Sequence, residues 1–378
     1  MLPITIGRNP SIHLCTYMLS RYYTYSQFES YFSTLIRRFK IESLEEIEIG
    51  KSVLGKSIYG LKLGTGSTKI LAWSQMHGNE STTTRALCQL LESVDIENNL
   101  NSFKLYIIPI LNPDGAESWT RVNANNVDLN RDAMDLSQPE STILRKVIND
   151  YQPDYCLNLH GQRTIYGSLD GKSPVQMSFL APAGDKDRKI TEVRLKSMNV
   201  INHIYSQLKN KVNGIIGRYD DAFNINCVGD YLTSVHIPTI LFEAGHSGSD
   251  YSRDEVTYLV HDSLVVALNT INDGISQKNT TLRSYEDIPA IASNFTDVLI
   301  KNYPSKNGFT SLYIQYHEQI NANKLYFVPI LIGLNRKDIL NAHEVIDLSD
   351  VSTFENDLVI DENLEVYSES LNIKIFTN

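Results

Sequence analysis

Between about residue 20 and residue 275, apolar runs with the spacing of β-strands alternate with stretches whose apolar positions have the spacing of α-helices. Short continuous or alternating apolar runs indicate strands, whereas apolar residues at every third or fourth position indicate helices. Strands are predicted at 57–63, 69–75, 104–111, 154–160, 176–182, 213–217 and 238–243. Helices are predicted between them at 81–95, 137–150, 188–210, 229–235 and 251–272. This order predicts an α/β fold, with a mixed, mostly parallel sheet and helices on both of its faces.

The pattern changes near residue 275. The segment 273–284 is polar and rich in turn-forming residues, and we interpret it as a linker. One helix is predicted at 287–302, and extended runs follow at 311–316, 324–334 and 371–376. We therefore expect an α/β domain over residues 1–275 and a small, β-rich appended domain of unknown role over residues 285–378.

Composition and charge exclude some classes of partner. The chain of 378 residues has a net charge of −10, which argues against binding to nucleic acid or to an anionic membrane. Residues 341–378 alone account for −8 of this charge, so the acidity says little about an active site. No apolar run is long enough for a membrane helix, and the N-terminus does not resemble a signal peptide, so we expect a cytoplasmic protein. The four cysteines are widely scattered, which favours buried free thiols over disulfides.

Four polar residues stand at or just beyond the ends of predicted strands: His77, Asn112, His160 and Glu243. In a largely parallel sheet, the loops that leave the carboxyl ends of the strands gather functional residues at one edge. Glu80 follows His77 by three residues, so one turn can aim an imidazole and a carboxylate at the same cation. His160 is the best third ligand because it ends a predicted strand. Three protein ligands and one open position are typical of a catalytic zinc, and we expect one here.

Two further features predict chemistry near such a site. The segment from Asp128 to Arg131 places an Asn–Arg pair in a turn-like stretch, and a guanidinium binds a carboxylate through two parallel hydrogen bonds. Anion recognition is the functional interpretation, and a surface ion pair of Arg131 with Asp128 or Asp132 is the structural one. Glu243 ends an apolar strand, where a carboxylate is costly to bury unless it is paired or used. It is therefore a candidate general base or a partner in a structural salt bridge.

The order of these motifs resembles that of the M14 family of zinc metallocarboxypeptidases. The resemblance covers roughly residues 45–272, and the matching segments are Gly50–Ile58, His77–Glu80, Asn112–Gly115, Val127–Arg131, Asn158–Gly161 and Phe242–Glu243. It implies a zinc carboxypeptidase-like catalytic domain over residues 1–275 that holds one Zn²⁺ per chain. It also implies hydrolysis of the C-terminal peptide bond of a substrate that carries a free carboxylate.

The resemblance assigns the metal chemistry to five residues. His77, Glu80 and His160 match the zinc ligands of the family. Glu243 matches the base that activates the zinc-bound water and then passes the proton to the leaving amine. Arg121 matches the arginine that polarises the scissile carbonyl and stabilises the oxyanion, as a preplaced positive charge would do.

Substrate recognition is assigned in the same way. Asn130 and Arg131 match the pair that binds the terminal carboxylate, and Asp128 matches an acid that orients the first zinc-binding histidine. Tyr219 is the best match to the substrate-capping tyrosine, although the segment after it aligns poorly and Tyr231 and Phe223 are rivals. Residues 227–230 should approach the specificity pocket, and they show no decisive charged determinant. We expect His246 and residues 250–253 to shape the mouth of the pocket.

Other functions remain open at this point. Deacylases of the succinylglutamate desuccinylase and aspartoacylase type use a similar His and Glu pair and carry a C-terminal β domain, so an acylated amino acid is an alternative substrate. Asn112–Gly115 and the stretch from Arg121 to Arg131 look more like those of peptidases. A cell-wall peptide carboxypeptidase is a further variant. A non-catalytic binding protein would have lost a ligand or the base, and neither is missing here.

Overall fold

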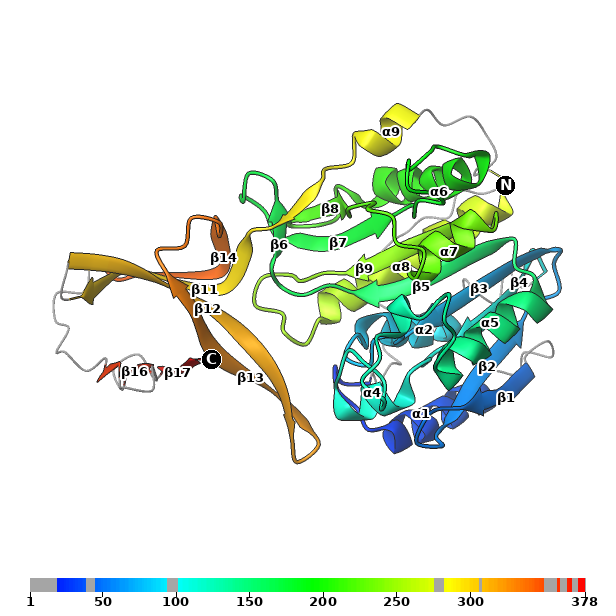
Figure 1. Ribbon diagram of the computed structural model, residues 1–378, viewed down its shortest axis with the longest axis horizontal. Helices are drawn as coiled ribbons and strands as arrows, with labels where there is room; N and C mark the ends of the chain where they lie inside the picture. Colours follow the sequence, from blue (N-terminus) through cyan, green and yellow to red (C-terminus); the bar gives the residue numbers. More distant parts are fainter. Residues whose placement is uncertain are drawn as a thin grey trace.

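The computed structural model describes residues 19–38, 45–93, 101–274, 282–305, 308–349, 359–360, 366–368 and 373–377. They form an α/β unit followed by a β-rich region (Figure 1). No helix among these residues is long and apolar enough to cross a membrane. Outside the described part lie Cys15, residues 275–281 of the predicted linker and most acidic residues of the segment 341–378.

A mixed eight-stranded sheet is the framework of the α/β unit. Its strands are β1 (Glu45–Lys51), β2 (Ser57–Leu63), β3 (Thr68–Ser74), β4 (Phe103–Ile108), β5 (Tyr155–Gly161), β7 (Val175–Leu180), β8 (Ile215–Arg218) and β9 (Thr239–Ala244). They lie in the order β1-β2-β4-β3-β5-β9-β7-β8. The central strands β4, β3, β5 and β9 are parallel to one another, whereas β2 and β7 join them antiparallel. The predicted mixed, mostly parallel sheet is confirmed.

Helices cover both faces of this sheet. Five occur where they were predicted: α2 (Thr82–Glu92), α5 (Pro139–Tyr151), α6 (Glu192–Leu208), α7 (Val228–Ser234) and α8 (Asp254–Asn272). Successive residues of β3 point to opposite faces. Ile70 and Ala72 belong to the apolar core beneath α2, α6 and α8, together with the unpredicted helix α1 (Tyr25–Arg38). Leu71 and Trp73 belong to the core beneath α5 and α7.

The β-rich region forms a second sheet. Its strands are β11 (Phe295–Ser305), β12 (Gly308–Asn321), β13 (Lys324–Leu334), β14 (Asn341–Asp347), β15 (Val359–Ile360), β16 (Val366–Ser368) and β17 (Ile373–Thr377), in the order β14-β11-β12-β13-β17-β16-β15. The three predicted extended runs coincide with β12, β13 and β17. The long antiparallel hairpin of β12 and β13 is the best-paired part of this sheet.

The predicted helix at 287–302 is wrong. This segment forms β10 (Ile291–Ser293) and the start of β11. Val298 and Ile300 enter one apolar cluster, whereas Leu299 between them enters another, so the run is buried on both faces of the sheet. A short apolar run that is buried on both sides has no period that separates a strand from a helix. Pairing with two other strands, β12 next along the chain and the more distant β14, decided the outcome.

The two parts of the chain are joined by strand pairing as well as by sequence. β10 pairs antiparallel with β6 (Tyr166–Ser168), which belongs to the segment that follows β5. A short helix, α9 (Leu282–Glu286), precedes β10. Figure 1 shows the β-rich sheet beside the α/β unit, on the side of β6. The β-rich region is therefore close enough to contribute to a site at the ends of β5 and β9.

Candidate metal centre and substrate cavity

The loop that leaves β3 carries His77 and Glu80 and leads into α2. The Glu80 N–H donates to the His77 carbonyl over 3.1 Å, which closes a turn. His77 Nδ1 then lies 2.8 Å from Glu80 Oε1. A Cβ on Gly78 would approach the carbonyl carbon of Gly115 to 1.9 Å, so only glycine allows the turn to pack against the short helix α4 (Pro113–Ser118).

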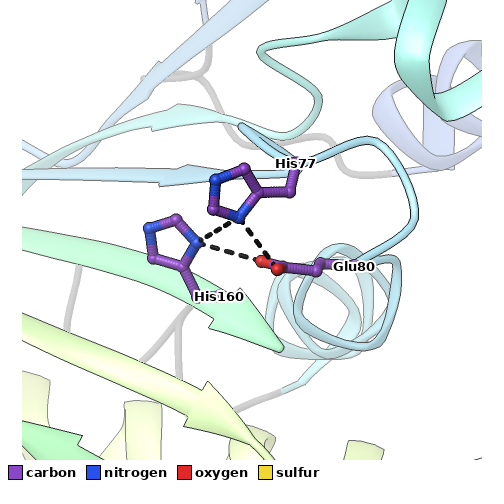
Figure 2. A group of neighbouring side chains, drawn as sticks. All are labelled: His77, Glu80 and His160. Carbon is purple, nitrogen blue, oxygen red and sulfur yellow. Dashed lines mark hydrogen bonds and ion pairs between the residues drawn. The ribbon is translucent and has the colours of Figure 1, made fainter. Parts of the chain in front are cut away.

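His160, near the end of β5, completes the group. Its Nδ1 lies 2.9 Å from Glu80 Oε2 and 3.1 Å from His77 Nδ1. Figure 2 shows the three side chains pointing toward one another, His77 and Glu80 from the loop between β3 and α2 and His160 from near the end of β5. The Gly161 N–H donates to Glu80 Oε2 over 2.9 Å, which fixes the carboxylate. Residues predicted to be ligands are thus brought together by the fold.

The arrangement fits a divalent cation. The ligand atoms of His77, Glu80 and His160 all lie within 4.8 Å of one another, and the two histidines are buried. Two ligands of a tetrahedral zinc, each about 2 Å from the ion, are about 3.3 Å apart. The two Nδ1 atoms are 3.1 Å apart, close to that separation. Two imidazole nitrogens and a carboxylate are a donor set that suits zinc.

Asp128 holds His77 from the other side of the ring. His77 Nε2 lies 3.0 Å from Asp128 Oδ1, so this nitrogen carries a proton and Nδ1 faces the metal position. Asp128 Oδ1 also accepts the Asn130 N–H over 2.9 Å, and Oδ2 accepts Arg121 Nε over 3.1 Å. The acid therefore links the metal group to two other predicted site residues.

Charge coupling in this group is strong in the absence of a metal. Burial alone lowers the pKa of His77, but the carboxylates of Glu80 and Asp128 outweigh it and raise the pKa to about 9. Burial raises the pKa of Glu80, but the two histidines outweigh it and hold that pKa well below its usual range. Burial lowers the pKa of His160. The metal-free group thus holds one proton that a cation must displace.

Glu243 lies beside His160, because β5 and β9 are parallel and these two residues are register partners. Its side chain faces the cavity. No hydrogen bond or ion pair to this carboxylate is present in the described part of the chain, which disfavours the structural salt bridge. Burial, followed by repulsion from Glu80, raises the pKa of Glu243. A carboxylate with these properties can exchange a proton near neutral pH.

Arg121 reaches the cavity from the loop before Asp128. Its side chain is 48% exposed, and its Nη1 lies 3.5 Å from Glu80 Oε1. Burial lowers the pKa of Arg121, but Glu80 and Asp128 outweigh it and raise this pKa. A fixed positive charge therefore stands next to the metal group, open to the cavity.

Asn130 and Arg131 line the same cavity. Asn130 Oδ1 accepts the Val228 N–H over 2.9 Å, which ties the loop to the start of α7. Arg131 Nη1 donates to the Asn130 carbonyl over 2.7 Å and to Cys227 Sγ over 3.1 Å. Asp132, the expected surface partner, instead accepts hydrogen bonds from Ser137 and Gln138. Among the described residues Arg131 has no acidic partner, so its guanidinium is open to an anion.

Tyr219 lines the cavity, whereas its rivals Tyr231 and Phe223 do not belong to the lining. Its hydroxyl lies 2.7 Å from the hydroxyl of Tyr166, at the start of β6. Tyr231 instead packs its ring on Arg145, 3.8 Å from ring centre to guanidinium carbon. The structure thus favours Tyr219 as the cavity tyrosine and adds Tyr166 as its partner.

The cavity has a volume of about 950 Å³. Part of its wall comes from the β-rich region, with Asp297, Gln315, Tyr316, His317, Glu318, Phe327, Ile330 and Ile332. No motif indicated these residues, because the recognisable segments end near residue 272. Tyr251 and Arg253 line the cavity as expected, but His246 is buried behind it, with its ring 4.6 Å from that of Tyr251.

Part of the chain is similar to a known protein family. Residues 40–221 match the family described as zinc carboxypeptidase, Peptidase_M14. Carboxypeptidase M of Mus musculus is 28% identical over 144 residues, which are 30% of this chain and 32% of that protein. Carboxypeptidase SOL1 of Arabidopsis thaliana is 31% identical over 141 residues, which are 30% of this chain and 28% of that protein. The matches span about a third of these relatives or less.

Solved structures share the fold. A metallo-carboxypeptidase from Burkholderia cenocepacia superposes with a TM-score of 0.53 and 16% identity, over 67% of this chain and 70% of that one. Carboxypeptidase A from Helicoverpa armigera gives a TM-score of 0.52 and 17% identity, over 67% and 74% of the two chains. The family match overlaps the loops that carry His77, Glu80 and His160. Just under half of this chain, residues 40–221, therefore resembles the zinc carboxypeptidase family, Peptidase_M14.

Proposed function

We propose that this protein is a zinc-dependent carboxypeptidase that hydrolyses the C-terminal peptide bond of peptides. One observation carries the proposal. A single cavity brings together a three-ligand metal group, the unpaired carboxylate of Glu243 and the unpaired guanidinium of Arg131. These are the groups that a metal-assisted hydrolase with a preference for a terminal carboxylate needs.

The substrate is oriented by its free carboxylate. Arg131 binds this group through parallel hydrogen bonds, and the Asn130 side chain holds the loop that positions the guanidinium. The scissile carbonyl then lies near Arg121 and the metal group. An internal peptide bond offers Arg131 no carboxylate, so the enzyme removes terminal residues.

The chemistry divides between the metal and two side chains, those of Glu243 and Arg121. When bound by His77, Glu80 and His160, a zinc ion supplies Lewis-acid polarisation and makes a water molecule more acidic. Glu243 accepts a proton from the attacking water and then donates it to the leaving amine. Arg121 stabilises negative charge on the carbonyl oxygen. Removal of the Glu243 carboxylate should lower kcat by about 10²- to 10⁴-fold.

Four measurements on the purified full chain test this function. Metal analysis should find one zinc per chain, and a strong chelator should abolish activity that added zinc restores. A panel of peptides that differ only in the last residue should be trimmed from the C-terminus. Glu243→Gln should keep its zinc and lose activity. Full activity of this zinc-loaded variant would disprove the mechanism.

A second candidate is a zinc-dependent deacylase of N-acyl amino acids. The observation that favours it is the part of the cavity wall supplied by the β-rich region, because deacylases of this type carry a C-terminal β domain. The capped α4 turn at Asn112–Gly115 and the spacing of Arg121 and Arg131 favour a peptidase. N-acyl amino acids and C-terminal peptides with the same last residue, compared by kcat/KM, separate the two. Recycled cell-wall peptides belong in the same panel.

A further inference from the structure

Arg253 is a buried arginine in the wall of the cavity, on the residue before α8. It is 4% exposed. Its Nη1 donates to the carbonyl of Gln162 over 2.9 Å and to that of Ala244 over 3.0 Å. These carbonyls follow His160 and Glu243 closely in the sequence, so Arg253 stands directly behind the ends of β5 and β9.

No acidic side chain in the described part of the chain pairs with Arg253, and its buried Nε has no hydrogen-bond partner there. The neighbouring acids are engaged elsewhere: Asp254 with Arg85, Glu318 with Arg21 and Trp119, and Asp297 with Tyr251. A buried charge without a counter-ion is unfavourable. Nearby Arg21 adds repulsion, and burial followed by this repulsion lowers the pKa of Arg253 to about 10. Among the described residues Arg253 thus has no ion-pair partner.

Arg253 and Arg131 both line the cavity, but they contact different elements of the fold. Arg131 contacts Cys227, next to the start of α7. Arg253 donates to carbonyls at the ends of β5 and β9. There, attraction to Glu318 and Asp297 of the β-rich region acts to raise its pKa, against the effect of burial. Glu80 of the metal group acts on Arg253 as well. The proposed function puts the terminal carboxylate on Arg131 and the scissile carbonyl at the metal group, which leaves the part of the cavity lined by Arg253 for the acyl part of the substrate.

We infer that Arg253 binds a carboxylate carried by the acyl part of the substrate, on the side of the scissile bond opposite the leaving residue. This inference rests on the proposed function and narrows its substrates to those with two anionic groups. The carboxylate can come from an acidic side chain just before the scissile bond, or from a dicarboxylic N-acyl group such as succinyl. Both present the same oxygens to the part of the guanidinium that lines the cavity.

Kinetics on the zinc-loaded full chain separate the two sources. One pair of substrates is N-acetyl-Glu-X and N-acetyl-Gln-X, and the other is N-succinyl-X and N-butanoyl-X, where X is the preferred last residue. We expect a roughly 10- to 100-fold higher kcat/KM for the acidic member of one pair, as a charge-assisted hydrogen bond provides. Arg253→Gln should remove this preference and leave the neutral member within a few-fold of the wild type.

Two variants control for charge and structure. Arg163→Gln removes another cavity arginine, which is exposed, and should keep the preference. Arg253→Lys retains a positive charge and should recover part of the preference for the acidic substrate. Equal kcat/KM for both members of both pairs in the wild type overturns the inference. An equal loss on acidic and neutral substrates in Arg253→Gln also overturns it, because it indicates only a supporting role for the Gln162 and Ala244 carbonyls.

A binding measurement separates this inference from the proposed function. Calorimetry on the zinc-loaded wild type should show tighter binding of N-acetylglutamate than of N-acetylglutamine, and Arg253→Gln should bind both alike. If no substrate is cleaved but this difference remains, the carboxypeptidase function fails and the anion site stands. If peptides are cleaved and the two ligands bind the wild type equally, the anion site fails.

Discussion

His160 and Glu243 are register partners on the adjacent parallel strands β5 and β9, so a metal ligand and an unpaired carboxylate stand side by side. Their separation in the sequence is large, but the pairing of two buried strands fixes their distance. The carboxylate is held in a poorly solvated place next to Glu80, which raises its pKa. The same pairing therefore sets both the position and the proton affinity of the proposed base.

The pH dependence of catalysis should report Glu243. A base must be ionised to act, and burial followed by repulsion from Glu80 raises the pKa of this residue. We therefore expect kcat/KM to fall on the acidic side of neutrality, with an apparent pKa above the ordinary glutamate value of about 4.3. The profile is measured with one neutral peptide over a range of pH in the zinc-loaded enzyme. In Glu243→Gln the residual activity should lose this limb; an unchanged limb assigns it to another group.

Metal binding should release a proton. The metal-free group holds His77 with a pKa of about 9, so its imidazole is charged at pH 7.5 and must lose a proton when a cation binds. Calorimetric titration of the metal-free protein with Zn²⁺, in buffers of different ionisation enthalpy, should give about one proton per zinc. Asp128→Asn removes one cause of the raised pKa and should release less. It should also weaken zinc binding by about 10- to 100-fold.

Arg131 should control the requirement for a terminal carboxylate. Arg131→Met removes the unpaired guanidinium and should lower kcat/KM for a free peptide by about 10- to 100-fold, the worth of a charge-assisted hydrogen bond. The same peptide with an amidated C-terminus should be a poor substrate for both proteins, with little difference between them. A comparable loss on both peptides would show that the variant damages the site in general.

Asp230 should make the protein less stable as the pH rises. It lies in the cavity wall and is 5% exposed, and burial raises its pKa to about 6. Below about pH 4 the carboxyl is neutral in both the folded and the unfolded chain, so its ionisation does not lower the free energy of unfolding. Between about pH 4 and 6 the Asp230 carboxyl ionises only in the unfolded chain, so the free energy of unfolding declines, by up to about 3 kcal/mol, and then levels off.

Urea unfolding over this range should show the decline in the wild type. Asp230→Asn, which carries no charge at any pH, should lack this component, and parallel curves for the two proteins would contradict the prediction.

The sequence by itself determined the α/β order of elements and the candidate metal ligands. Long periodic helices and buried central strands carry a strong local signal, so α2, α5, α6, β3, β5 and β9 are found within a few residues of their predicted bounds. The pair His77 and Glu80 lies within one turn, so its spacing could be read directly. His160 and Glu243 needed only the rule that parallel strand ends meet.

Only the tertiary structure decided the rest. Segment 287–302 became strands because pairing with β6, β12 and β14 satisfied its backbone, and no local periodicity records such pairing. The sequence likewise does not reveal that the β-rich region supplies part of the cavity wall. It also does not reveal that Arg253 is unpaired, because the acid Asp254 is its neighbour in the sequence. In the folded structure Asp254 forms an ion pair with Arg85 instead. Whether a charge is paired depends on contacts between residues far apart along the chain, so only the folded structure determines where the negative charge is missing.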